Sequence, residues 1–274
     1  MNLKLPEDFE SRWKILAKKY KSIQDPWGLD IKKTKILSKY LYQLYAHYFR
    51  VRFFADEDYS DKQFIAIGNH TAQLPFDALM VEMAFFLNNK NPVLLRGMIE
   101  KFLAGFPLLG KLSAQGGSVL GDRKNAEFLL KQKESLLVFP EGVRGISKST
   151  SKHYQIQNFT RGFFRIALKH RTPILPIAIV GAEELYPYVM NVKPLAKFFN
   201  LPAFPITPTF PFLGPLGMLP LPSPIDIYVG KLIPIPENIS KNATDEEIDV
   251  YVEKIQKQID QMMQKGLKNK RKML

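Results

Sequence analysis

The 274-residue chain contains no cysteine, and this absence excludes several kinds of chemistry at once. A protein without cysteine has no disulfide bonds, no thiolate metal ligands and no cysteine nucleophile. A serine nucleophile is not indicated either, because Ser118 lies in Gly-x-Ser-x-x-Gly and not in the Gly-x-Ser-x-Gly of a hydrolase elbow. The histidines and carboxylates show no metal-ligand spacing. We therefore expect no metal ion and no bound cofactor.

The chain also lacks a continuous apolar segment that could cross a membrane. Its longest stretch without a formal charge, residues 198–225, contains eight prolines, and each proline removes a backbone donor and clashes with the preceding helical turn. The first residues, MNLKLPEDFESRWKIL, lack the uninterrupted apolar core of a signal peptide. We expect a protein that is soluble or lies on a membrane without spanning it.

Acidic residues are scarce relative to basic ones. The chain has 39 Lys and Arg against 26 Asp and Glu, which gives a formal net charge of +13. Such a balance favours anionic partners, namely nucleic acid, a phospholipid surface or a phosphorylated substrate. The basic residues are spread along the chain and form no known nucleic-acid-binding signature, so nucleic acid is the least favoured of the three. A non-catalytic basic module that binds anionic lipid or nucleic acid remains the alternative to an enzyme.

Apolar strand-like runs alternate with helix-like segments along most of the chain. The patterns predict strands at 49–54, 64–67, 92–96, 136–139, 174–180 and 225–229, and helices at 9–20, 31–48, 76–87, 122–131, 161–170 and 246–264. This alternation is typical of an α/β fold with a mixed, mainly parallel sheet flanked by helices. We expect an N-terminal helical segment at 1–48, an α/β domain at 49–240, and a C-terminal helix with a basic tail at 241–274 packed on that domain.

One histidine stands where open α/β sheets place their functional sites. His70 follows the predicted strand at 64–67, and Asp77 stands at the start of the next predicted helix. A histidine in this position can act as a general base when a carboxylate orients its ring and stabilises the imidazolium. Taken alone, a histidine after one strand more often caps a turn or is hydrogen-bonded in the core.

Two further segments combine small residues with an arginine. Phe139-Pro140-Glu141-Gly142-Val143-Arg144 follows another predicted strand, and Leu120-Gly121-Asp122-Arg123 precedes a predicted helix. Glycine lets the backbone approach a ligand closely, and the planar fork of arginine suits a phosphate. Each segment by itself could be a plain turn or a helix N-cap, the latter supplied by Asp122.

Taken together, these segments resemble the glycerolipid (lysophospholipid) acyltransferase family, typified by bacterial 1-acylglycerol-3-phosphate acyltransferases. Four blocks occur in the family's order over roughly residues 50–230 of the chain. They are Gly68-Asn69-His70 with Asp77, Leu120-Gly121-Asp122-Arg123, Phe139-Pro140-Glu141-Gly142-Val143-Arg144, and Ile174-Leu175-Pro176-Ile177-Ala178-Ile179. The third block is the most specific, since it is similar to the family's Phe-Pro-Glu-Gly-Thr-Arg.

Two departures from the family pattern bear on the candidate site. The family spacing is His-x4-Asp, but Thr71 to Phe76 separate His70 from Asp77, and Pro75 occupies the usual place of the aspartate. A Leu-Pro insertion, Leu74-Pro75, can bulge out of the loop and still return Asp77 to the imidazole. The other departure is Val143 in place of threonine, which removes a hydroxyl group but no charge.

The resemblance implies transfer of a fatty acyl group from a thioester, acyl-CoA or acyl carrier protein, to a hydroxyl of a lysophospholipid or glycerol phosphate-type acceptor. It implies His70 as the general base, Asp77 as the residue that orients it, and Arg123 and Arg144 as ligands of the acceptor phosphate. Glu141 and Gly142 would shape that phosphate pocket. The partners it implies are the two substrates and the cytoplasmic face of a membrane, bound peripherally, and not nucleic acid. Within 198–225, eight apolar side chains could dip into the membrane or simply cover the core: Phe198, Phe199, Leu201, Phe204, Phe210, Phe212, Leu213 and Leu216.

Overall fold

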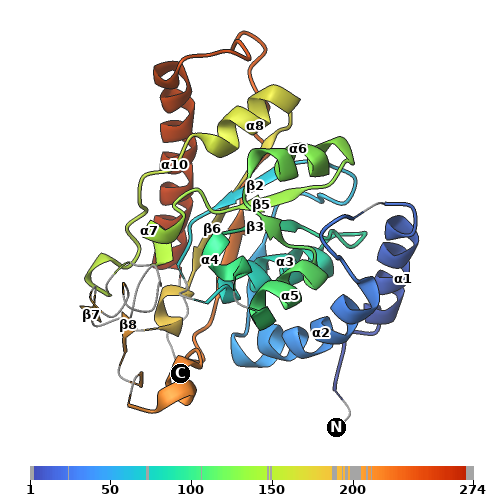
Figure 1. Ribbon diagram of the computed structural model, residues 1–274, viewed down its shortest axis with the longest axis vertical. Helices are drawn as coiled ribbons and strands as arrows, with labels where there is room; N and C mark the ends of the chain where they lie inside the picture. Colours follow the sequence, from blue (N-terminus) through green and yellow to red (C-terminus); the bar gives the residue numbers. More distant parts are fainter. Residues whose placement is uncertain are drawn as a thin grey trace.

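The computed structural model describes residues 3–23, 25–71, 74–105, 107–146, 148, 150–186, 190–192, 194, 197, 205–207, 209–210 and 212–269. These residues form a seven-stranded sheet with helices on both faces (Figure 1). Its strands are β1 (Arg52–Phe54), β2 (Ile65–Gly68), β3 (Arg96–Ile99), β4 (Val119–Leu120), β5 (Leu136–Val138), β6 (Ile174–Val180) and β9 (Asp226–Val229). Two further short strands, β7 (Met190–Asn191) and β8 (Pro205–Ile206), pair separately.

The strand order is β1-β9-β6-β2-β5-β3-β4. Every neighbouring pair runs parallel except β6 and β9, which run antiparallel. The central strands β2 and β6 are unbroken apolar runs and are buried throughout, as expected for strands covered on both faces. The predicted α/β fold with a mixed, mainly parallel sheet is confirmed.

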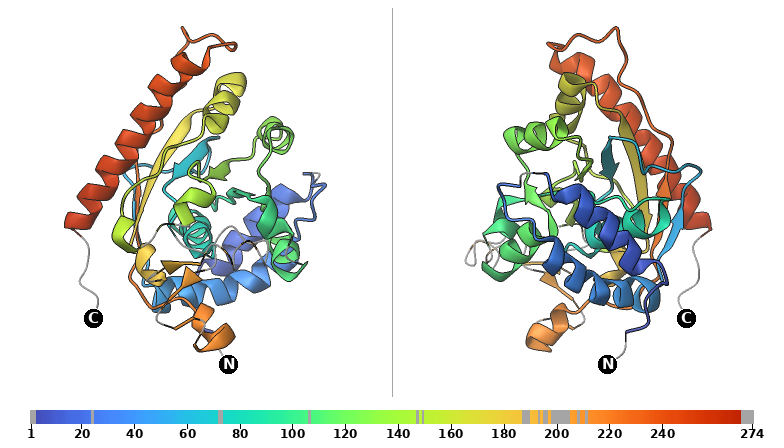
Figure 2. Two further views of the ribbon diagram at one scale, coloured as in Figure 1. Left: turned by 60° about the vertical axis from the view of Figure 1, so that its left-hand side comes forward. Right: turned by 90° about the vertical axis from the view of Figure 1, so that its right-hand side faces the viewer.

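The helices divide into two layers, one on each face of the sheet. They are α1 (Phe9–Tyr20), α2 (Ile31–Gln43), α3 (Phe76–Asn88), α4 (Lys101–Ala104), α5 (Pro107–Gly116), α6 (Arg123–Lys131), α7 (Val143–Ile146), α8 (Gly162–His170) and α10 (Asp245–Lys268), with the short π-helix η1 (Leu44–Tyr48) and the 3-10 helices η2 (Thr150–Lys152), η3 (Glu183–Leu185) and η4 (Gly214–Met218). Figure 2 shows α10 and the α1–α2 pair on opposite sides of the molecule.

Helices α1 and α3 bury their apolar stripes on the first face. Phe9 and Trp13 of α1 both pack edge-on or tilted against Phe86 of α3. Aromatic contacts of this kind add about 0.5–1.5 kcal/mol each to the burial of the rings. The N-terminal helical segment therefore shares one core with the sheet.

Helices α6, α8 and α10 cover the second face. Helix α10 begins with a capping box, in which the Thr244 hydroxyl accepts from the Glu247 backbone and the Glu247 carboxylate accepts from the Thr244 backbone. Its stripe of Ile248, Val252 and Ile255 is buried against this face, as the spacing predicts.

Some element boundaries differ from those predicted. The strand expected at 92–96 begins only at Arg96, where the backbone starts to pair with Leu136 of β5. Residues Val93 to Leu95 are buried but do not pair with a neighbouring strand. The apolar pattern reports burial alone, so it could not distinguish this segment from a strand. Helices α4 and α5 were not predicted.

Much of the proline-rich stretch 198–225 lies outside the described residues, including Phe198, Phe199, Leu201 and Phe204. Within the described part, Phe210 is half-buried and Phe212 is 82% exposed. Among the helices that the structure describes, none combines the length and the apolar composition needed to cross a bilayer.

The parallel strands bring their carboxyl ends to one edge of the sheet. His70 follows β2, Glu100 follows β3, Arg123 follows β4 and Glu141 follows β5. The parallel strands therefore place these residues along one edge of the sheet, and this edge carries the candidate site.

Candidate active site

The loop after β2 is anchored before it reaches His70. Asn69 is fully buried, and its side-chain amide donates to the Ile179 carbonyl at 3.0 Å and accepts from the Ile179 amide at 2.8 Å. This pair of hydrogen bonds ties the end of β2 to the neighbouring strand β6. The residue directly before His70 is therefore held in place by the sheet.

His70 and Asp77 meet despite the long spacing between them. Nδ1 of His70 lies 2.7 Å from Oδ2 of Asp77, which is fully buried in the first turn of α3. The same oxygen accepts from the Thr71 amide at 3.0 Å. The expected Leu74-Pro75 insertion lies directly before α3, where the Phe76 amide donates to the Leu74 carbonyl at 2.7 Å. Its expected result, a carboxylate on the imidazole, is present.

The electrostatics of Asp77 favour its ionised form. Burial acts to raise the pKa of Asp77, but the charge of His70 and hydrogen bonds from His70 and from the Thr71 and Ala78 amides outweigh it, so the pKa lies below its usual range. An ionised carboxylate at Nδ1 requires the proton to be on Nδ1. Nε2 is then unprotonated and can accept a proton, as a general base must.

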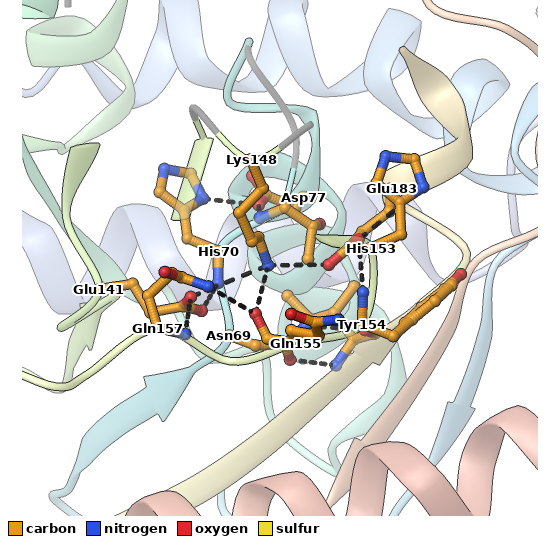
Figure 3. A network of polar contacts seen from close by, with 12 residues as sticks. Asn69, His70, Asp77, Glu141, Lys148, His153, Tyr154, Gln155, Gln157 and Glu183 are labelled. Atoms are coloured by element: carbon orange, nitrogen blue, oxygen red, sulfur yellow. Dashed lines mark hydrogen bonds and ion pairs between the residues drawn. The ribbon is translucent and has the colours of Figure 1, made fainter. Parts of the chain in front are cut away.

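Glu141 holds the His70 backbone from beneath. Its side chain is buried, its Oε1 accepts from the His70 amide at 2.9 Å, and its Oε2 accepts from the Gln157 amide at 2.7 Å (Figure 3). Burial raises the pKa of Glu141, while the charge of Lys148 and these hydrogen bonds act in the opposite direction. Glu141 therefore shapes the site from within the protein and fixes the position of the His70 backbone amide.

Two glycines after Glu141 allow this close packing. Gly142 has a φ of +56°, in the left-handed region that favours glycine. A Cβ atom at Gly145 would lie 2.9 Å from both the Cβ and the carbonyl oxygen of His70, closer than such atoms approach. Helix α7 can therefore lie against His70 only because residue 145 has no side chain.

The two predicted phosphate-binding arginines lie beside one segment, near Asn158. Arg144 is exposed on α7, and its Nη2 donates to the Asn158 carbonyl at 2.8 Å. Arg123 is exposed at the start of α6 and lines a groove of about 910 Å³ together with Asn158 and Arg161. The structure thus gathers His70, Asp77, Glu141 and Gly142 at one point and places Arg123 and Arg144 along the Asn158 segment. Their contact with a phosphate stays a prediction.

The sequence patterns missed the polar groups behind Glu141. Lys148 and Glu183 are buried, and they form an ion pair of 2.9 Å behind the loop that carries Glu141. Lys148 lies in a loop without regular spacing, and Glu183 comes after the fourth block, so no local pattern marked either residue. Among the described residues no group of three or more histidines and carboxylates is arranged to hold a metal ion.

Comparison with known proteins points to the acyltransferases. The acyltransferase family model matches residues 50–180. An uncharacterised protein of Mycobacterium tuberculosis is 38% identical over 184 residues, which is 66% of this chain and 51% of the relative. A 1-acyl-sn-glycerol-3-phosphate acyltransferase of Limnanthes douglasii is 30% identical over 137 residues, 46% of this chain and 44% of that protein.

A solved structure shares the fold over most of the chain. The crystal structure of the 1-acyl-sn-glycerophosphate (LPA) acyltransferase PlsC from Thermotoga maritima gives a TM-score of 0.56 at 18% identity, covering 95% of this chain and 89% of that one. The chain spans about half the length of the Mycobacterium tuberculosis relative it matches. Residues 50–180 of the chain therefore match the acyltransferase family.

Proposed function

We propose that the protein is an O-acyltransferase that moves a fatty acyl group from a thioester donor to a hydroxyl of a lysophospholipid or glycerol phosphate-type acceptor. The donor is acyl-CoA or acyl carrier protein, and the reaction belongs to phospholipid biosynthesis or remodelling. The observation that carries the proposal is the His70–Asp77 pair, 2.7 Å apart at the carboxyl edge of the sheet within an acyltransferase domain.

His70 serves as the general base in this proposal. Nε2 takes the proton of the acceptor hydroxyl as its oxygen attacks the thioester carbonyl, and Asp77 stabilises the imidazolium that forms. The C–S bond then breaks, the new ester is released, and the proton passes from the imidazolium to the departing thiolate. General-base catalysis contributes about 10²–10⁴-fold, so substrate positioning must supply the rest of the acceleration.

Arg123 and Arg144 serve as the phosphate ligands in this proposal. Both guanidinium groups are exposed beside the Asn158 segment, and a planar fork can pair with two phosphate oxygens. Glu141 and Gly142 support this region through the backbone. The acceptor would then bind with its phosphate at the arginines and its hydroxyl near Nε2 of His70.

Peripheral binding to the cytoplasmic face of a membrane completes the proposal. The net charge of +13 would attract the protein to anionic lipid, at about 1 kcal/mol for each basic residue near the surface. Exposed apolar side chains at Phe212, Leu213 and Leu216 could enter the interface.

An assay of the purified chain tests the proposed function. The protein is incubated with acyl-CoA or acyl carrier protein thioesters and a panel of lysolipids, and products are identified by mass spectrometry. We expect a diacyl product from at least one phosphorylated acceptor and none from His70→Ala. Anionic vesicle binding without any product would instead support the non-catalytic binding module, and binding to duplex DNA at the same salt would support the nucleic-acid alternative.

A further inference from the structure

A lysine lies buried directly behind Glu141. The side chain of Lys148 is 4% exposed, and it stands between two carboxylates that are themselves buried, Glu183 and Glu141. Its Nζ lies 2.9 Å from Oε1 of Glu183 and 3.8 Å from Oε2 of Glu141 (Figure 3). Lysines are rarely buried, and those that are buried are paired with carboxylates, as Lys148 is here. The cost of burying three charged groups together suggests that this cluster has a function.

The far side of the lysine is also fixed by the protein. Glu183 stands in η3 just beyond β6, and its Oε2 accepts from the Tyr154 amide at 2.6 Å. The Lys148 ammonium also donates to the Gln155 carbonyl at 3.4 Å. Lys148 is thereby held against the segment 154–157, the same segment whose Gln157 amide donates to Glu141.

The contacts form a chain that ends at the base. Glu183 holds Lys148, Lys148 faces Glu141, and Glu141 accepts from the His70 backbone amide. Both oxygens of Glu141 accept from N–H groups, and protonation would weaken one of these oxygens as an acceptor and add an O–H that needs an acceptor of its own. The hold of Glu141 on His70 is therefore strongest in the carboxylate form, which the cation beside it favours.

We propose that Lys148, braced by Glu183, is a positioning residue for His70: it holds the Glu141 carboxylate, which in turn holds the His70 backbone. The catalytic consequence rests on the proposed function, but the positioning itself does not. The charged or titratable groups around Glu141 are His70 after β2, Lys148 in the loop after α7, and Glu183 and His153 on the far side of Lys148. Glu100 after β3 lies close to the neighbouring Gly142.

The His70 backbone amide reports the state of Glu141 without any catalysis. The chain has only four histidines, so [15N]histidine labelling gives four backbone amide signals, and His70→Gln identifies the one of interest. Because this amide donates to Glu141, protonation of the carboxylate should move its signal. The experiment follows the His70 amide against pH in the wild-type protein and in each variant.

Two variants should move this titration in opposite directions. Lys148→Met removes the cation and leaves two buried carboxylates together, so the midpoint should rise by about 1–3 pH units. Glu183→Gln leaves Lys148 with Glu141 as its remaining carboxylate, so the midpoint should fall. The double variant Lys148→Met/Glu183→Gln should lie between Lys148→Met and the wild type, and Lys152→Met, which removes an exposed lysine nearby, should change nothing.

Turnover provides the second measurement. Lys148→Met should lower kcat at neutral pH by up to about 100-fold with a smaller change in KM, and Lys148→Arg should recover part of it. Folded variants in which the His70 amide titrates as in the wild type would overturn the proposal. If Lys148→Met does not fold, an unmoved or raised midpoint in Glu183→Gln overturns it alone. Opposite amide shifts without any turnover in the wild type would uphold the positioning and reject the proposed function.

Discussion

The imidazole of His70 lies flat on the ring of Phe139, with centroids 4.6 Å apart and planes 14° from parallel. Phe139 comes from the end of β5 and His70 from the end of β2, so two sequence blocks that are far apart in the chain meet ring to ring. Asp77 fixes one edge of the imidazole, Glu141 fixes its backbone, and Phe139 fixes the plane of the ring. His70 is therefore held from three directions by the protein itself.

Replacing Phe139 with leucine should misalign the base without removing it. A stacked aromatic contact contributes about 0.5–1.5 kcal/mol, so we expect kcat to fall about 2- to 10-fold with little change in KM. Phe128→Leu, at a partly exposed ring that packs on Trp27, is the matched control and should leave kcat unchanged. Steady-state kinetics decide the matter, and equal kcat values for both variants would show that the stacking has no part in turnover.

Replacing Asp77 with asparagine should impair both catalysis and acid-side stability. Asparagine cannot stabilise an imidazolium, so kcat should fall by about 10²–10⁴-fold. The pKa of Asp77 is lowered in the folded state, so its ionised form stabilises the fold at pH values above its unfolded pKa of about 3.9, and this stability is lost as the pH falls through the folded pKa. Thermal unfolding should therefore show wild type above Asp77→Asn at neutral pH, with the gap closing below about pH 4. A constant gap at all pH values would contradict the ionised pairing.

The sequence was sufficient to predict the sheet and to pick out His70 and Asp77 as partners. Buried strands such as β2 and β6 are continuous apolar runs, and their carboxyl ends indicate where His70 should lie. It was not sufficient for β3, because only pairing with β5 makes a strand of an extended apolar segment. Lys148 and Glu183 could not be predicted either, since their partnership exists only after the chain brings segments 35 residues apart together.

Arg144 and Arg123 should serve substrates that carry a phosphate. A hydrogen bond to a charged group is worth about 1.5–3 kcal/mol, so Arg144→Ala and Arg123→Ala should each lower kcat/KM about 10- to 100-fold with a phosphorylated acceptor. Acceptors without a phosphate should lose much less. Lys124→Ala, next to Arg123 and also exposed, is the control and should lose little with either acceptor. Equal losses with both acceptors would indicate that the arginines support the fold instead.

A carboxyl group on α3 should make the protein less stable as the pH rises from about 4 to about 8. Glu82 is half-buried, and burial raises its pKa to about 8 although the charge of Arg96 acts against this. The unfolded pKa is about 4.3, so between the two values the unfolded state releases the proton first and stability falls as the pH rises. Glu82→Gln should remove this loss, and the gain in melting temperature over wild type should grow from pH 5 to pH 8. A gain that does not change with pH would mean that Glu82 titrates normally.

An exposed apolar segment beside η4 should insert into anionic membranes. Phe212, Leu213, Leu216 and Leu219 are all more than half exposed, and Figure 1 shows η4 projecting from the lower end of the molecule, the end at which α2 lies. Helix α2, at the same end of the molecule, carries the exposed side chains of Ile36 and Tyr40 and several lysines. The combination of apolar and basic groups is the kind that binds an anionic lipid interface.

Phe212→Ser combined with Leu216→Ser tests this insertion by vesicle flotation. Burying one large apolar side chain contributes about 1.5–3 kcal/mol, so the double variant should bind at least about 10-fold more weakly to vesicles with anionic lipid, at low salt as well as high. Val250→Ser, at an apolar side chain of α10 that is 50% exposed, is the matched control and should bind like wild type. Binding of the wild type should also weaken as salt rises, because exposed charges are screened beyond about 8 Å at physiological ionic strength. If the double variant remains folded and floats like wild type, the membrane contact lies elsewhere, and the basic residues of α1, Lys14, Lys18 and Lys19, become the next surface to neutralise.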